Sequence, residues 1–165
     1  MPWVNPTTVS TGDVLTASRY NSDVVANWNM YGAAWTDWTP TLSGGWANGN
    51  ATTTGKYLKI GRFVSYWTRV VVGSTTTKGT TLIVSLPVTA AAADSAVSSS
   101  FAYLQRSGSF AYEAFIYPQT TTTVQLLAVD ASGTYAASAG ITATVPFAWA
   151  TNDSFYMTGT YEASS

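Results

Sequence analysis

From residue 36 onward, short β-prone stretches alternate with turn signals, and this pattern constrains the fold more than any other feature. The turn signals contain Gly or Asn: Gly44-Gly45, Asn48-Gly49, Gly55, Gly61, Gly73, Gly79, Ser107-Gly108, Ser132-Gly133 and Thr151-Asn152-Asp153. The stretches between them are rich in Val, Thr and aromatic residues, which suit a pleated surface. They predict strands over 37–43, 55–60, 62–72, 80–86, 97–105, 109–117, 122–129, 141–149 and 154–162. We therefore expect an all-β fold, an antiparallel sandwich or barrel.

Several of these strands are apolar on both faces. In the stretch 62–72, Phe63, Trp67 and Val71 alternate with Tyr66 and Val70. An antiparallel sheet with one face in water has one polar face, so a second apolar face needs a cover. Another copy of the chain is the simplest cover and predicts a homo-oligomer. A solvent-facing aromatic sheet is the alternative, because exposed apolar atoms are common.

The first 36 residues differ from the rest, and we expect two parts: an attachment segment over 1–36 and a β-body over 37–165. Pro2, Pro6 and Gly12 lie in the first fifteen residues and predict an extended arm. Trp3 is a large apolar residue in this polar arm. It either packs against the protein's own body or docks onto a partner chain.

Residues 16–31 predict one short helix, with Thr16 or Ser18 as its cap and Gly32 as its stop. Its apolar residues follow one stripe at spacings of 3, 4, 4 and 3: Ala17, Tyr20, Val24, Trp28 and Tyr31. A helix of this length is marginal alone in water. The stripe must therefore be buried on the β-body, on other copies of the helix, or on another protein.

The composition excludes several kinds of chemistry. The chain has no Cys and no His, which removes thiolate and imidazole catalysis and the metal sites that these residues build. Charged residues are 9% of the chain and the net charge is −1, which argues against nucleic acid and anionic membranes as partners. No apolar run reaches membrane-span length, and the first residues do not resemble a signal peptide. We expect synthesis in a cytoplasm without export.

Eight carboxylates remain, but no spacing among them selects a glycosidase pair or a calcium loop. Asp130 and Asp153 lie in turns, where such side chains commonly accept backbone hydrogen bonds. We therefore expect neither an enzyme nor a metal or cofactor. Trp46 and Tyr135 lie near turn signals and are candidate stacking platforms for a glycan. A place in the core is the alternative for each.

Two groups of motifs carry a resemblance. The opening, Pro2-Trp3 followed by Thr11-Gly12-Asp13-Val14-Leu15-Thr16-Ala17-Ser18-Arg19-Tyr20-Asn21, resembles the start of many small structural proteins of tailed bacteriophages, especially those infecting actinobacteria. The segments Trp38-Thr39-Pro40-Thr41-Leu42, 55–64, Leu86-Pro87 and 146–162 resemble a module frequent at the C-termini of phage tail fibres and minor tail proteins.

This resemblance implies a non-enzymatic, homotrimeric virion protein that is made in the host cytoplasm. It implies a minor tail, fibre or receptor-binding protein whose β-body can meet a host-surface glycan. Residues 1–36 would join the copies and attach them to other virion proteins. The expected assembly contacts are Trp3, Tyr20, Val24, Trp28 and Tyr31. A capsid decoration or head-fibre protein is the first alternative. A glycan-cleaving tail protein is the second, and the short chain counts against it.

Overall fold

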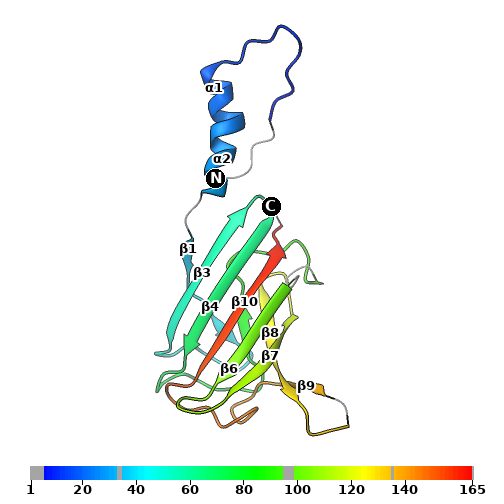
Figure 1. The fold of residues 1–165 in the computed structure, drawn as a ribbon. Coiled ribbons are helices and arrows are strands. Elements are labelled where there is room, and N and C mark those ends of the chain that lie inside the picture. Colours follow the sequence, from blue (N-terminus) through cyan, green and yellow to red (C-terminus); the bar gives the residue numbers. More distant parts are fainter. Residues whose placement is uncertain (1–5, 33–34, 95–98, 135, 165) are drawn as a thin grey trace.

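The computed structural model describes residues 6–32, 35–94, 99–134 and 136–164, which form a β-body with one helical rod beyond its end (Figure 1). The strands are β1 (Thr36–Trp38), β2 (Leu42–Ser43), β3 (Thr52–Ile60), β4 (Phe63–Val71), β5 (Ile83–Ser85), β6 (Ser99–Gln105), β7 (Ala111–Pro118), β8 (Thr123–Asp130), β9 (Ala137–Gly140) and β10 (Ser154–Glu162). The predicted mostly-β fold is confirmed.

All the strands belong to one antiparallel sheet in the order β1-β3-β4-β10-β6-β7-β8-β5-β2, with β9 beside β8. The first and last strands of this order are consecutive in the chain. Trp38 ends β1 and Leu42 begins β2, and a four-residue step spans at most about 14 Å. The two ends of the sheet must therefore approach each other, and the sheet curls into a half-barrel.

The core lies inside this curl and follows the alternation of the strands. Along β4, Val64, Tyr66 and Val70 point inward, and along β10 Phe155 and Tyr161 do so. The rings of Tyr66 and Tyr161 pack edge to face at 5.7 Å between centroids. Burying a large apolar side chain contributes about 1.5–3 kcal/mol, so these inward rows hold the two central strands together. In the described chain the buried hydrophobic core runs from residue 42 to residue 163.

Two of the predicted strands are wrong in detail. The stretch 37–43 is split by Pro40 into β1 and β2, because proline has no N–H for the ladder. The stretch 141–149 is a loop, and the short strand β9 precedes it. Its apolar residues Phe147 and Trp149 are buried and stack at 4.6 Å between ring centroids. Phe147 and Trp149 occupy alternate positions and both enter the core, because the loop closes one end of it. This spacing resembles the alternation of a strand.

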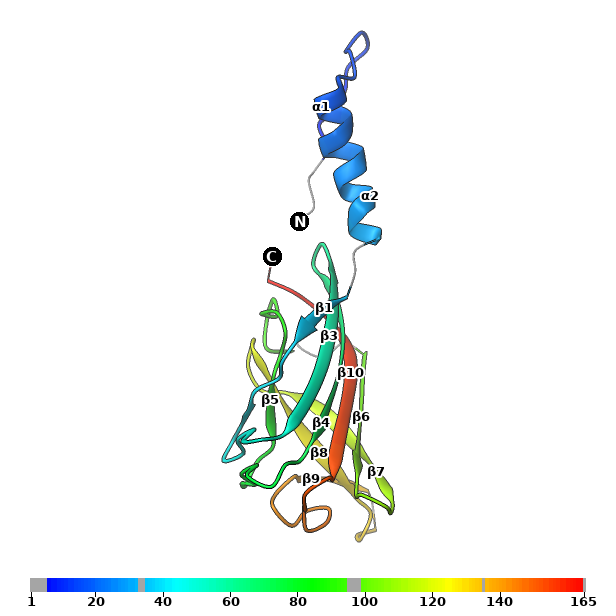
Figure 2. The ribbon, with the colours of Figure 1, turned by 90° about the vertical axis from the view of Figure 1, so that its left-hand side faces the viewer.

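The helical rod consists of α1 (Ala17–Tyr20), a π-helical turn η1 (Asn21–Val25) and α2 (Ala26–Tyr31). Its predicted cap is confirmed, since the Thr16 hydroxyl accepts the Arg19 N–H at 3.3 Å. The preceding segment is not a straight arm: the Asp13 N–H donates to the Ser10 carbonyl at 3.1 Å, and Gly12 has φ +95°. The chain turns there, so that the first residues of the segment 6–16 lie beside the helix that follows it. Both views show the rod beyond the body, above β3, β4 and β10 (Figures 1 and 2).

Tyr161 links the last strand to the loop after β5 and leads to a prediction. Its hydroxyl donates to the Val88 carbonyl at 2.6 Å and accepts the Val88 N–H at 3.0 Å. Tyr161→Phe leaves both backbone groups without this partner, so we expect the free energy of unfolding to fall by about 1–3 kcal/mol in urea titrations at pH 7.

The stability difference between Tyr161→Phe and the unmodified chain should depend on pH, because this hydroxyl can ionise. Burial raises the pKa of Tyr161 from 10.0 to about 12, so the fold favours the neutral phenol. Its contribution is present below pH 10 and is lost as the pH rises toward 12. Between these values Tyr161→Phe should lose less stability than the unmodified chain. Equal losses would show that the fold does not shift the pKa of this hydroxyl.

Candidate functional site

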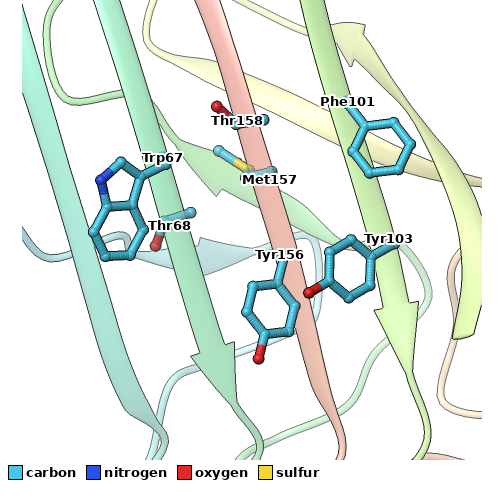
Figure 3. Close-up of a pocket in the computed structure, with 7 residues that line it drawn as sticks. All are labelled: Trp67, Thr68, Phe101, Tyr103, Tyr156, Met157 and Thr158. Atoms are coloured by element: carbon cyan, nitrogen blue, oxygen red, sulfur yellow. The ribbon is translucent and has the colours of Figure 1, made fainter.

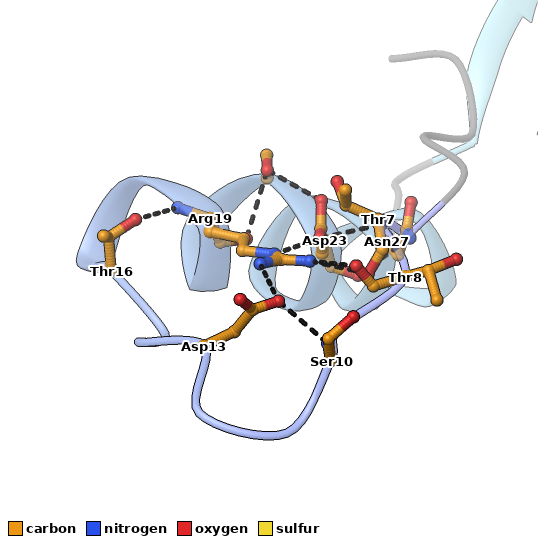
Figure 4. A network of polar contacts seen from close by, with 9 residues as sticks. Thr7, Thr8, Ser10, Asp13, Thr16, Arg19, Asp23 and Asn27 are labelled. Atoms are coloured by element: carbon orange, nitrogen blue, oxygen red, sulfur yellow. Dashed lines mark hydrogen bonds and ion pairs between the residues drawn. The ribbon is translucent and has the colours of Figure 1, made fainter.

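Two parallel stripes of side chains run along the helical rod, one polar and one apolar. The polar stripe is Arg19, Asp23 and Asn27, and the apolar stripe, one residue later at each step, is Tyr20, Val24 and Trp28. The returning segment 6–16 lies against the polar stripe (Figure 4). The chain thus covers one side of its helix with its own backbone.

Charge-assisted hydrogen bonds hold the returning segment in place. The Arg19 guanidinium donates to the carbonyls of Thr7 at 3.0 Å and Thr8 at 2.7 Å. The Thr7 N–H donates to the Asp23 carboxylate at 3.0 Å. Asp13 accepts the Ser10 N–H at 2.8 Å, and its carboxylate lies 3.9 Å from the Arg19 guanidinium. The Asn27 side chain, 5% exposed, donates to the Asp23 carbonyl at 3.0 Å.

Asp23 is the centre of this network, and its replacement is a direct test of it. The Thr7 N–H and the Ser22 hydroxyl, helped by the nearby Arg19, lower the pKa of Asp23 from 3.8. The carboxylate therefore holds the segment above pH 3.8 and releases it as the pH falls below that value. Asp23→Asn removes the charge at every pH, so we expect faster hydrogen exchange at the Thr7 amide at pH 7.

A matched control for this variant is Asp37→Asn. The Asp37 carboxylate pairs with Lys56 at 2.8 Å on β1 and β3, and its side chain is 86% exposed. It carries the same charge but lies on the β-body. Exchange at Thr7 should be unchanged in this control. If both variants leave the Thr7 amide equally protected, the carboxylate of Asp23 does not hold the segment.

The apolar stripe stays open to solvent in the single chain. Tyr20 is 46% exposed and Trp28 is 70% exposed, while Val24 is half-buried. The π-helical turn between them closes i→i+5 hydrogen bonds and rotates less per residue than an α-helix. Side chains four residues apart therefore drift less around the axis, and the stripe runs nearly straight along the rod. Trp3 and the side chain of Tyr31 lie outside the described residues.

A second surface lies on the outer side of the sheet, over β4, β10 and β6. We call it the outer aromatic face: Trp67, Arg69, Phe101, Tyr103, Tyr156 and Thr158. Figure 3 shows all of these residues except Arg69. The strand register aligns these residues in two rows. One row runs Trp67, Thr158, Phe101, and the other runs Arg69, Tyr156, Tyr103. Further exposed rings flank the face, with Phe63 52%, Phe115 56% and Tyr117 55% exposed.

Of the two glycan candidates from the sequence, Trp46 is not part of either surface. Trp46 is only 3% exposed, and its ring meets that of Trp149 edge to face at 5.5 Å. Its turn-rich surroundings indicate a loop tip, but the loop folds inward and uses the indole to close the core. The structure thus places Trp46 in the core, the alternative for this residue. Tyr135 lies outside the described residues.

The turn carboxylates serve the backbone, as predicted. Asp153, 2% exposed, accepts the N–H groups of Ser107 at 2.8 Å and Ala150 at 2.6 Å. Asp130 accepts the Ser132 N–H at 2.9 Å, and hydrogen bonds from Ser132 lower the pKa of this exposed carboxyl. Within the described ranges, no cluster of three or more acidic side chains is placed to hold a metal ion. None of the helices in those ranges is long and apolar enough to cross a membrane.

The sequence predicts the apolar stripe, but two other features are not predicted from it: the polar stripe and the outer aromatic face. The polar stripe repeats the same four-residue spacing, which is a readable signal once the two stripes are compared. The outer aromatic face depends on pairing between β4, β10 and β6, which are far apart in the chain.

Comparisons with family models, with curated proteins and with solved structures found no match to this chain.

Proposed function

We propose that the protein is a non-enzymatic structural component of a tailed-phage virion, a homotrimer made in the host cytoplasm and built into a minor tail or fibre position. Residues 1–36 join the copies and attach them to other virion proteins, and the β-body faces outward, where it can meet a host-surface glycan. One observation carries this proposal. The helix stands beyond the body with its apolar stripe open, while its own chain covers the adjacent polar stripe.

This arrangement favours association through the apolar stripe. Large exposed aromatic side chains on a short helix gain stability when another surface covers them. The covered polar stripe fixes which side of the rod remains available, so partners meet the helix on the side of Tyr20 and Trp28. The straight stripe suits a bundle of parallel helices. The number of three copies comes from the resemblance to phage structural proteins.

The carboxylates support a non-enzymatic role. Four of the eight accept backbone N–H groups: Asp13, Asp23, Asp130 and Asp153. Two more are paired with cations: Asp37 with Lys56 at 2.8 Å, and Glu162 with Arg62 at 3.0 Å. A glycosidase needs two carboxyl groups about 5–10 Å apart around one bond, free to act as acid and base or nucleophile. Carboxylates engaged in these structural contacts are poorly suited to those roles.

The test is quantitative mass spectrometry of purified particles from a phage that encodes this chain. We expect its peptides in the particle, in a copy number divisible by three. Cryo-electron microscopy of the same particles locates the protein, and density on the capsid shell would support the decoration alternative. Absence from particles, despite presence in the lysate, contradicts the proposal. Release of reducing ends from host cell-wall polysaccharide by the purified chain contradicts the non-enzymatic part.

A further inference from the structure

The outer aromatic face contains a hollow that the proposed helix contact leaves uncovered. The hollow has a volume of about 170 Å³ and lies over β10, with Trp67 on one side and Phe101 on the other (Figure 3). Thr158 lies between these two rings in the strand register and is exposed. Apolar patches of this kind on a protein surface commonly mark places where another molecule docks.

The two threonine hydroxyls in the hollow are already used within the chain. The Thr158 hydroxyl donates to the Tyr66 carbonyl at 2.9 Å, and the Thr68 hydroxyl donates to the Thr54 carbonyl at 2.9 Å. A sugar presents many hydroxyls, and a site that binds it must offer hydrogen-bond partners for them. The hydroxyl protons of these two threonines are therefore not available to donate to a sugar. The hollow suits an apolar protein surface better than a glycan.

Two of the rings beside the hollow, Tyr103 and Tyr156, are poorly placed for stacking on a sugar. Tyr103 and Tyr156 stack on each other at 4.4 Å between centroids, with 12° between their planes. The Arg69 guanidinium lies 5.1 Å from the centre of the Tyr156 ring. The faces of Tyr156 are therefore occupied from within the chain. This packed cluster of Arg69, Tyr156 and Tyr103 resembles the surfaces that meet another protein.

The charges at the two ends of this row are complementary. The strand register continues from Arg69 through Tyr156 and Tyr103 to Glu113 on β7. Both Arg69 and Glu113 are exposed, and in the described part of the chain neither forms an ion pair. One copy thus offers a cation at one edge of the face and an anion at the other. A head-to-tail contact brings Arg69 of one copy to Glu113 of the next, and such contacts form a ring where the rotation between copies closes.

We propose that the outer aromatic face is the contact between the β-bodies of neighbouring copies, with Arg69 of one copy facing Glu113 of the next. This inference rests on the proposed function, because it requires an assembly. The helical rod stands above β3, β4 and β10 in both views, so an axis through the bundled helices continues along this face (Figures 1 and 2). In an assembly around such an axis, the helix contact and the body contact follow one another along it.

The chain has no Cys, so a single introduced cysteine reports solvent access without background. We place it at Thr158→Cys in the face and, as the control, at Ser132→Cys in the exposed turn after β8. Phe101→Cys, at a side chain that is 50% exposed in the single chain, is a second reporter in the face. In the assembled full-length protein we expect maleimide to label positions 158 and 101 at least about tenfold more slowly than position 132.

Charge exchange tests the predicted pairing. On the Thr158→Cys chain, Arg69→Glu and Glu113→Arg should each speed the labelling of position 158. The two changes together should restore the slow rate. A double variant that labels as fast as the single variants contradicts the pairing between Arg69 and Glu113.

Light scattering on the same samples separates the two proposals. An assembled mass with fast labelling at positions 158 and 101 contradicts only the body contact. If soluble cell-wall polysaccharide then slows the labelling, the face binds a sugar and the body contact is again contradicted. A single-chain mass contradicts the proposed function and this inference together.

Discussion

Replacement of both Tyr20 and Trp28 by aspartate should convert the assembled protein into single chains of 17.5 kDa. Both side chains belong to the exposed apolar stripe of the helical rod. Removing one buried Trp typically costs about 3–5 kcal/mol, and each 1.4 kcal/mol is about tenfold in affinity. Two like charges in the contact add repulsion. Light scattering at micromolar concentration measures the mass, and circular dichroism should show an unchanged β signal.

Asn29→Asp is the matched control for this variant. Asn29 is exposed on the same helix, about 140° around the axis from the middle of the apolar stripe on ideal helical spacing. The control adds one negative charge to the helix, where the double variant adds two, and the assembled mass should be unchanged. A double variant that stays assembled to the same dilution as the unmodified chain would show that the stripe is not part of the contact. A double variant that loses its β signal would show that the helix belongs to the core of the body, which would contradict the division at residue 36.

The second large effect is expected at Gly79, where two loops of the body cross. A Cβ on Gly79 would overlap the backbone of Gly45, and rigid backbone cannot move aside as a side chain can. The crossing is held by the Ala143 N–H donating to the Gly79 carbonyl at 3.0 Å and the Thr81 N–H donating to the Gly44 carbonyl at 3.0 Å. We expect Gly79→Ala to lower the free energy of unfolding by about 3 kcal/mol in urea titrations.

Gly140→Ala is the control for this prediction. A Cβ at Gly140 meets no atom within 4 Å, so the substitution adds the same methyl group in open space. Its effect should lie within about 0.5 kcal/mol of zero. A Gly79→Ala variant as stable as Gly140→Ala would mean that the two loops do not pass as closely as the structure has them.

The features that the sequence predicts well are those that depend on neighbouring residues. The alternation of β4 and β10 is visible because each inward residue lies two positions from the next, and the Thr16 cap is visible because it acts three residues away. The features that it misses depend on distant partners. Trp46 and Trp149 are about a hundred positions apart in the chain, and only their contact shows that both loops fold inward.

The surfaces of the protein show the same division between features set by neighbouring residues and features set by distant partners. The apolar stripe follows from helical spacing alone, and the exposed ring of Phe63 and the half-exposed ring of Trp67 follow from alternation in a single strand. The row from Arg69 to Glu113 crosses four strands, and its order is set by register between segments distant in the chain. The return of residues 6–16 along the helix depends on how Arg19 and Asp23 engage the backbone of Thr7, which spacing alone does not predict.

We propose that the chain associates through its helix into an assembly of three. The most direct measurement is the mass of the unmodified full-length protein by light scattering and mass photometry, over a dilution series from micromolar to nanomolar. We expect a species of three times 17.5 kDa that persists at micromolar concentration. A stable 17.5 kDa species at micromolar concentration would contradict it.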